Sequence, residues 1–208
     1  MMGVWDLGRA ALLCLTGGAA DAISYLRFGT FVGAMTGSTV LLGIDIASYR
    51  IDQAIYHGGI IGVFFVAGML THFAQLHKVL ATLPLLLAAV LLGASELVAG
   101  PWSATLCAAA LAVQNAGVRQ VGGVSLNSVF ITGDLLSLGA AISRGKCPRR
   151  RKETAVLATG LVSYAAGALA GAVGVHLMRH PMIGPAVLAL AAALLFLNDG
   201  RDAGVGRA

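Results

Sequence analysis

Charged residues are scarce in this sequence, and their scarcity excludes most soluble functions. Only 11% of the 208 residues are charged, whereas 58% are hydrophobic and the mean hydropathy is +0.85. No stretch is polar and long enough to form a soluble domain. Several apolar runs approach the roughly 20 residues that cross a bilayer core. The sequence therefore predicts an all-α integral membrane protein with a single transmembrane domain, residues 1–208.

Signatures of catalysis and of metal binding are also missing. The three cysteines are widely spaced, and the five histidines have no paired metal spacing. Nothing resembles a nucleophile elbow, a phosphate-binding loop or a zinc-protease helix. We therefore expect no enzymatic activity, no catalytic residues, no metal and no cofactor. The net charge of +5 comes mostly from one short cluster beside an apolar run, so we expect no nucleic-acid partner.

The sequence contains eight apolar segments, which form two sets of four. They cover residues 10–26, 30–47, 54–75, 79–98, 102–118, 124–143, 154–178 and 182–197. With 28 glycines and only 6% aromatic residues, the predicted helices can approach one another closely. We expect a compact polytopic helical bundle in the lipid bilayer.

The second set of segments echoes the first. Residues 31–46, FVGAMTGSTVLLGIDI, return in altered form at 129–142, VFITGDLLSLGAAI, at a shift of 96 positions. Further matches follow in order, such as Gly62 with Gly160 and Gly68 with Gly167. We interpret these matches as an internal repeat of about residues 10–99 and 102–197.

Both repeats carry a polar-glycine step inside an apolar run, at 36–38 and 132–134. In lipid, a freed backbone group costs several kcal/mol unless something satisfies it, so such a step belongs where protein or water covers it. Ser38 and Asp134 are both N-cap residue types that precede apolar runs. Each half is therefore predicted to contain a discontinuous helix that restarts in mid-span. The alternative is that the glycine and threonine residues only pack two helices closely.

Basic residues predict the orientation. Cytoplasmic loops are rich in Lys and Arg, and the strong basic cluster comprises Arg144, Lys146, Arg149, Arg150, Arg151 and Lys152. The matching loop of the first half has a single base, Arg50. This asymmetry favours halves inserted in opposite senses, with three crossings and a half-depth piece each. The rival count is eight full crossings in parallel repeats, and both counts place the N- and C-termini in the cytoplasm.

The motifs resemble those of a known family. GGAADAISYLRFGTFVGAMTGSTVLLG, ALAVQNAGVRQ and SVFITGDLLSLG resemble the YoaK-like family of bacterial inner-membrane proteins, domain of unknown function 1275. The resemblance covers roughly residues 12–197. That family carries Gly-x-x-Asp-Ala and Thr-Gly-Asn in one half, and Gln-Asn-Ala and Thr-Gly-Asn in the other. Ser38 and Asp134 stand here where the family has asparagine. The resemblance implies a bacterial inner-membrane location and an architecture, without a settled activity.

Polar residues inside apolar segments are the candidate solute-binding residues. Asp21 leads, because an intramembrane carboxylate is costly unless it faces a cavity or a partner; alternatively it lies at the membrane surface or pairs with Arg27 or Arg119. Gln114 and Asn115 could serve the same cavity or make interhelical hydrogen bonds. The predicted set is Asp21, Thr36, Gly37, Ser38, Gln114, Asn115, Thr132, Gly133 and Asp134. Arg27 and Arg119 are predicted to be gating or interfacial residues.

These features favour a small secondary transporter or permease for a small polar solute or a proton. Inverted halves would direct the positive ends of two helices, those starting at Ser38 and Asp134, toward one central region. The alternative is a non-catalytic membrane scaffold or assembly protein. An enzyme acting on lipid is disfavoured because no nucleophile-base pair is visible. A homodimer is compatible with so small a bundle.

Overall fold

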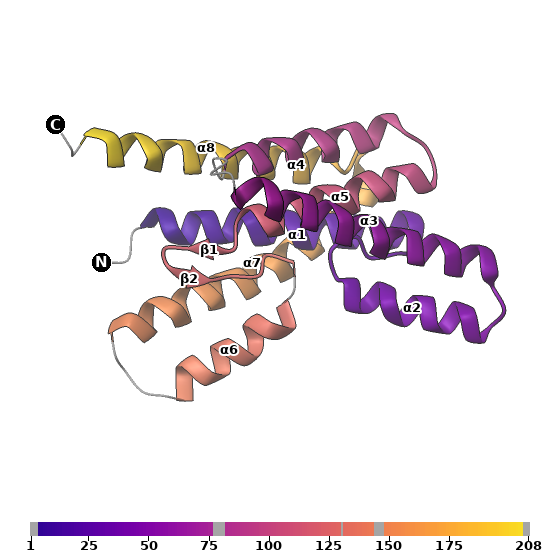
Figure 1. The fold of residues 1–208 in the computed structure, drawn as a ribbon, viewed down its shortest axis with the longest axis horizontal. Helices are drawn as coiled ribbons and strands as arrows, with labels where there is room; N and C mark the ends of the chain where they lie inside the picture. The colour runs from indigo at the N-terminus through magenta and orange to yellow at the C-terminus, as the bar shows by residue number, and fades with distance from the viewer. Residues whose placement is uncertain (1–3, 77–81, 130, 144–147, 206–208) are drawn as a thin grey trace.

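The computed structural model describes residues 4–76, 82–129, 131–143 and 148–205, and within them eight α-helices follow one another (Figure 1). They are α1 (Val4–Phe28), α2 (Met35–Ala47), α3 (Ile51–Leu76), α4 (Thr82–Ala94), α5 (Pro101–Gly117), α6 (Ile131–Ser143), α7 (Pro148–Leu177) and α8 (Ile183–Val205). A short 3-10 helix, η1 (Ser95–Leu97), extends α4. Each predicted apolar segment overlaps one of these helices, so the predicted all-α fold is confirmed.

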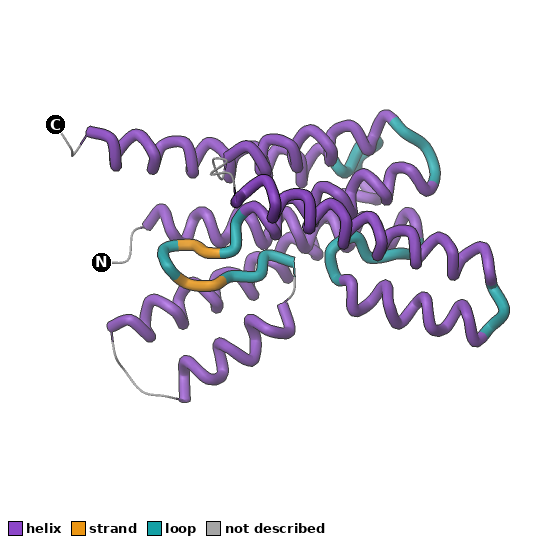
Figure 2. The backbone as a smooth tube through the Cα atoms, viewed as in Figure 1, coloured by secondary structure: helices purple, strands orange, loops and turns teal. Residues whose placement is uncertain are grey.

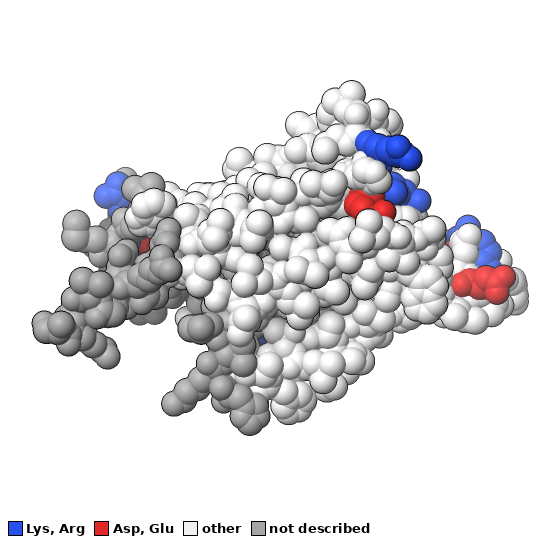
Figure 3. All heavy atoms as spheres, turned by 90° about the horizontal axis from the view of Figure 1, so that it is seen from above, with Lys and Arg blue, Asp and Glu red and all other residues white. Residues whose placement is uncertain are grey.

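Large apolar side chains cover much of the outside of the helices. Phe65, Val162 and Leu169 are 67%, 67% and 69% exposed. The face drawn in Figure 3 is mostly free of charged side chains, and those that it shows gather toward the two ends of the molecule. Soluble monomers rarely expose so much apolar surface. The segments Ile51–Gln75 of α3 and Arg150–Leu177 of α7 are each long and apolar enough to cross a membrane.

Two helices, α2 and α6, are too short to cross a bilayer. Each has 13 residues, which rise about 20 Å, whereas the hydrocarbon core is about 30 Å thick. In Figure 1 they lie toward opposite ends of the molecule, and each starts near its middle. These are the helices that follow the predicted interruptions. Helix α4 also has 13 residues, which η1 extends by three, and the number of crossings stays a prediction.

The contacts between helices form matching pairs, so that interchanging the two halves gives the same set of contacts. Helix α1 packs along α7, and α5 packs along α3. Likewise α1 contacts α8 while α5 contacts α4, and the short helices α2 and α6 pack on α3 and α7. A two-fold relation between residues 10–99 and 102–197 would produce these pairs. The duplication itself stays a prediction.

The interruptions lie earlier in the chain than predicted. Thr36, Gly37 and Ser38 form part of the first turn of α2, and the non-helical segment is 29–34. The N-cap of α2 is Ala34, so the prediction that a helix restarts at Ser38 was wrong. In the second half α6 already begins at Ile131, so Asp134 is not its N-cap. The N-cap pattern misplaced the start of α2 because Asp21, in the preceding helix, accepts hydrogen bonds from the backbone before α2.

A small β-hairpin precedes α6, which the sequence did not predict. Strands β1 (Gln120–Val121) and β2 (Val124–Ser125) pair antiparallel between α5 and α6, as Figure 2 shows in orange. Gly122 and Gly123 have positive φ angles of 58° and 78°, and they make the tight turn. The apolar segment predicted over 124–143 is therefore helical only from residue 131.

Candidate functional site

Asp21 binds the non-helical segment that precedes α2. Its side chain is buried in α1, with the residue 3% exposed. One carboxylate oxygen, Oδ1, accepts hydrogen bonds from the backbone N–H groups of Val32 (2.9 Å) and Gly33 (2.6 Å). The other, Oδ2, accepts from the Ala34 N–H (3.0 Å) and the Tyr164 hydroxyl of α7 (2.6 Å). The carboxylate thereby satisfies three consecutive backbone donors that a membrane interior would leave without partners.

The segment before α6 is held by Gln114 and Asp134. The Gln114 amide is fully buried; its Nε2 donates to the Leu13 carbonyl oxygen (3.0 Å) and to the Ser128 Oγ (3.1 Å). Asp134 Oδ2 accepts a hydrogen bond from the Asn127 N–H (3.0 Å). Both interrupted segments are thus anchored by a polar side chain from the helix before them, Asp21 in one half and Gln114 in the other.

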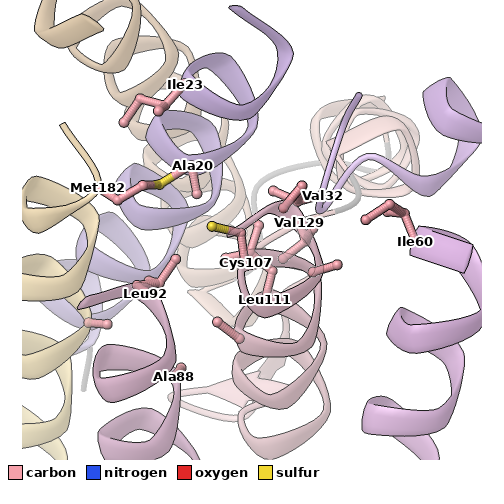
Figure 4. Packing of buried hydrophobic residues seen from close by; sticks show 14 of the residues in the cluster. Ala20, Ile23, Val32, Ile60, Ala88, Leu92, Cys107, Leu111, Val129 and Met182 are labelled. Carbon is pink, nitrogen blue, oxygen red and sulfur yellow. The ribbon is translucent and has the colours of Figure 1, made fainter. Parts of the chain in front are cut away.

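The two interrupted segments meet at the centre of the molecule. A methyl group on Gly33 would overlap the Val129 side chain and would lie 2.8 Å from Leu111 Cδ1. Figure 4 shows Val129 and Leu111 beside the segment that carries Val32. Val32, Leu111 and Val129 are each 1% exposed or less. This contact forms an apolar seal between the starts of α2 and α6.

The structure does not bring the predicted site residues into one cluster. Ser38 is buried, and its hydroxyl donates to the Phe31 carbonyl oxygen (2.7 Å). Gly37 packs against the Phe31 ring. Thr36, Thr132 and Gly133 are exposed. Within the described residues, no three His, Cys, Asp or Glu side chains are grouped as metal ligands.

A cavity between α3, α5 and the hairpin contains two of the predicted residues, Asn115 and Arg119. Its volume is about 290 Å³. The lining consists of Phe64, Gly68, His72, Ala112, Asn115, Ala116, Arg119, Ser125, Leu126 and Asn127. The Asn115 Oδ1 atom is buried and has no hydrogen-bond partner. Among the described residues no acidic side chain pairs with Arg119, and none lines the cavity. The cavity therefore presents a cation that has no acidic partner among the described residues, and the Asn115 amide, whose Oδ1 lies buried without a partner, forms part of its wall.

The matching position between α1 and α7 is closed. A methyl group on Gly68, in the cavity wall, would meet no atom within 4 Å. Gly167 is its counterpart in the predicted repeat, and a methyl group there would overlap the Leu15 backbone. Gly171 is likewise pressed against the Ala19 backbone. Helices α1 and α7 are thus in backbone contact where α5 and α3 leave a space.

Arg27, the other predicted gating or interfacial residue, pairs with an acid that the sequence did not single out. Its Nη1 lies 2.9 Å and 3.1 Å from the two carboxylate oxygens of Glu96, whose side chain is 5% exposed. Glu96 also accepts the Met182 N–H (2.7 Å) and lies 3.4 Å from His180 Nδ1. Arg27 therefore ties the end of α1 to η1 and the start of α8.

A second polar cluster links α2 to α3 at the opposite end from the hairpin. Asp45 is 2% exposed and lies 2.6 Å from both His57 Nδ1 and Arg50 Nη2. His57 Nε2 faces the Gly29 carbonyl oxygen at 3.3 Å. Asp45 stands near a loop in the sequence, and its burial depends on the packing of α2 against α3.

Comparisons with known proteins agree with this architecture. Residues 9–196 match the family described as "Protein of unknown function (DUF1275)". The chain is 27% identical over 179 residues to the UPF0700 transmembrane protein YoaK of Bacillus subtilis strain 168, covering 76% of this chain and 79% of that protein. No solved structure matches the chain. A transmembrane relative, together with helices long enough to span a bilayer, makes this an integral membrane protein, and the chain belongs to the DUF1275 family.

Proposed function

We propose that the protein is a small secondary permease, a carrier rather than an enzyme, whose solute binds in the cavity between α3 and α5. The observation that carries this proposal is Arg119, which pairs with no acidic side chain among the described residues and lines, together with Asn115, a cavity whose described lining holds no acid. A guanidinium binds carboxylates and other anionic groups, and an amide oxygen accepts from an N–H or O–H. The matching solute is a small amino- or hydroxy-carboxylate.

The two short helices support a carrier role. Helices α2 and α6 start near the middle of the molecule, on either side of the apolar seal formed by Val32, Leu111 and Val129 (Figure 1). Helix N-termini carry partial positive charge and favour anions. Thr36, Gly37, Thr132 and Gly133 lie in these first turns, beside any path that crosses the seal. Carriers built from inverted repeats bind solutes at such interrupted helices.

Ligand-induced stabilisation of the purified protein in detergent tests this proposal. The probes are glycine, alanine, lactate and glycolate, with choline as a cationic control. A solute present at 100 times its Kd stabilises the folded state by about 2.7 kcal/mol. We expect at least one carboxylate to raise the melting temperature of the wild type and of Arg179→Gln, a control far from the cavity. Arg119→Gln and Asn115→Leu should lose that response, and uptake of the same compound into liposomes should fall with it.

Two outcomes would contradict the carrier proposal. In the first, choline raises the melting temperature of the protein and no carboxylate does. In the second, a carboxylate stabilises the Arg119→Gln variant as well as the wild type. In either case the cavity does not bind solute through its cation.

A membrane scaffold is the second candidate function, and one observation favours it. Both Asp21 oxygens are occupied by protein donors, so this carboxylate acts as an internal support. A scaffold would need Asp21 for assembly while no compound is taken up. If Asp21→Asn abolishes assembly and the wild type takes up no carboxylate that stabilises it, the scaffold role replaces the carrier.

The proposed setting is the inner membrane of a bacterium, with both termini in the cytoplasm. Both ends of the chain lie at the same end of the molecule in Figure 1. Lys152 of the basic cluster pairs with Asp6 of α1 at 2.9 Å, so the start of α7 lies at that end too. Arg144 and Lys146 lie outside the described residues. The proposal also includes a homodimer as the oligomeric state.

A further inference from the structure

A second cavity, of about 680 Å³, lies between α6 and α7 near the basic cluster. Its lining consists of Ala141, Ile142, Arg150, Arg151, Thr154, Ala155 and Ala158. This volume is within the usual range of ligand sites. The cavity lies on helices other than those that form the proposed solute site, and its interpretation does not depend on transport.

Alanines line this cavity where the first half has a hydrogen-bonded Asp–His pair. In the predicted repeat, the shift of 96 places Asp45 opposite Ala141. The shift of 98 that relates Gly62 to Gly160 places His57 opposite Ala155. Asp45 and His57 join α2 to α3, whereas the two alanines leave space between α6 and α7. The second half therefore has no carboxylate at the position where Asp45 pairs with Arg50 in the first half.

Charge and apolar surface in the cavity point to one kind of occupant. Within the described residues neither Arg150 nor Arg151 pairs with an acidic side chain, and no acid lines the cavity. Beside it, α6 exposes large apolar side chains; Leu136 is 74% exposed and Ile142 is 65% exposed. Two guanidinium groups above an apolar wall match a phosphate group that carries an acyl chain.

We propose that the cavity between α6 and α7 binds the headgroup of an anionic phospholipid from the leaflet at the basic end of the molecule. Arg150 and Arg151 hold the phosphodiester, the Thr154 hydroxyl is a further donor, and an acyl chain lies along Ala155, Ala158 and the exposed face of α6. Basic pockets between membrane helices bind such lipids through the same chemistry.

Lipid titration of the purified full chain in detergent tests this proposal. The probes are dioleoylphosphatidylglycerol, zwitterionic dioleoylphosphatidylcholine, and inorganic phosphate as a soluble anion. We expect phosphatidylglycerol alone to raise the melting temperature and to remain bound in native mass spectrometry. The double variant Arg150→Gln/Arg151→Gln should bind it about tenfold more weakly or worse. Arg179→Gln, which removes a cation at the other end, should bind it as the wild type does.

A second variant tests the cavity without removing an arginine. Ala141→Asp/Ala155→His would copy the Asp45–His57 contact of the first half, add a carboxylate beside the two arginines and narrow the cavity, and should weaken lipid binding. Equal stabilisation by phosphatidylglycerol and phosphatidylcholine would overturn the proposal, as would unchanged phosphatidylglycerol binding by the double glutamine variant. Equal stabilisation by inorganic phosphate would show a soluble-anion site instead. None of these results depends on solute uptake, so this proposal and the proposed function can fail separately.

Discussion

The Asp21 carboxylate supplies the hydrogen-bond acceptors that a helix would otherwise provide for the backbone before α2. In the segment 29–34 the Gly29 N–H still donates to the Tyr25 carbonyl oxygen, as in a helix, but the N–H groups of the buried residues Val32 and Gly33 have no helical partner. Asp21 accepts three of its N–H groups, and Tyr164 completes the coordination from 143 positions further along the chain. Four donors around one carboxylate offset part of the cost of burying its charge. The residue thereby joins α1, α7 and the start of α2.

Replacing Asp21 with asparagine should destabilise the fold. One oxygen becomes an N–H₂ donor that faces other donors, and hydrogen bonds to a charged group contribute about 1.5–3 kcal/mol each. We expect the free energy of unfolding to fall by about 3 kcal/mol, measured by denaturant titration in detergent. Asp52→Asn, an exposed position in the first turn of α3, is the control and should leave stability unchanged. An Asp21→Asn protein of normal stability that takes up no solute would instead identify a solute ligand.

Helices α1 and α7 form the tightest element pair because glycine lets their backbones touch. Methyl groups on Gly18 and Gly167 would overlap the backbones of Tyr164 and Leu15, respectively. Small residues permit such approach in lipid, where packing and hydrogen bonds replace the hydrophobic effect. The close contact also fixes the position of Tyr164 on α7 relative to Asp21 on α1. This helix pair therefore positions the two side chains that hold the segment before α2.

Gly18→Ala should therefore separate α1 from α7. The new methyl group would meet the Tyr164 carbonyl group and the Ala168 backbone nitrogen, and backbone atoms cannot rotate away. We expect a loss of about 2 kcal/mol or more in unfolding free energy, with faster hydrogen exchange at Val32–Ala34. The matched control is Gly62→Ala in α3, where no atom lies within 4 Å. That control should gain up to about 1 kcal/mol from helix propensity, and equal effects of the two variants would contradict the packing argument.

At the scale of the whole molecule, one of two equivalent helix pairs encloses a cavity and the other is closed. The cavity between α3 and α5 contacts the hairpin at the end where the chain begins and ends. The equivalent pair, α7 and α1, is in backbone contact, and the apolar seal around Val129 separates the two regions. Under the proposed function, transport would exchange these arrangements, as expected for carriers whose repeats rock against each other.

Filling the open cavity should block transport without harming the fold. Gly68→Leu places a side chain in the space that Asn115 and Arg119 line, and leucine is the better helix former. We expect uptake of the stabilising carboxylate into liposomes to fall by about tenfold or more, an estimate based on losing one well-filled binding site, with an unchanged or higher melting temperature. Gly62→Leu, on an exposed part of the same helix, should transport normally. Normal uptake by Gly68→Leu would exclude the cavity from the path.

Hydropathy and motif spacing in the sequence by themselves determined the membrane class, the eight helical segments and the matched polar-glycine steps of the two halves. These properties are local, because a run of apolar residues must be helical in lipid wherever it lies in the bundle. Only the tertiary structure decided where α2 and α6 begin, that Arg27 pairs with Glu96, and that Asn115 and Arg119 share a cavity without Asp21. Those outcomes depend on partners from distant helices, such as Tyr164 for Asp21 and Leu13 for Gln114. The residues that neighbour Asp21 and Gln114 in the sequence do not indicate these partners.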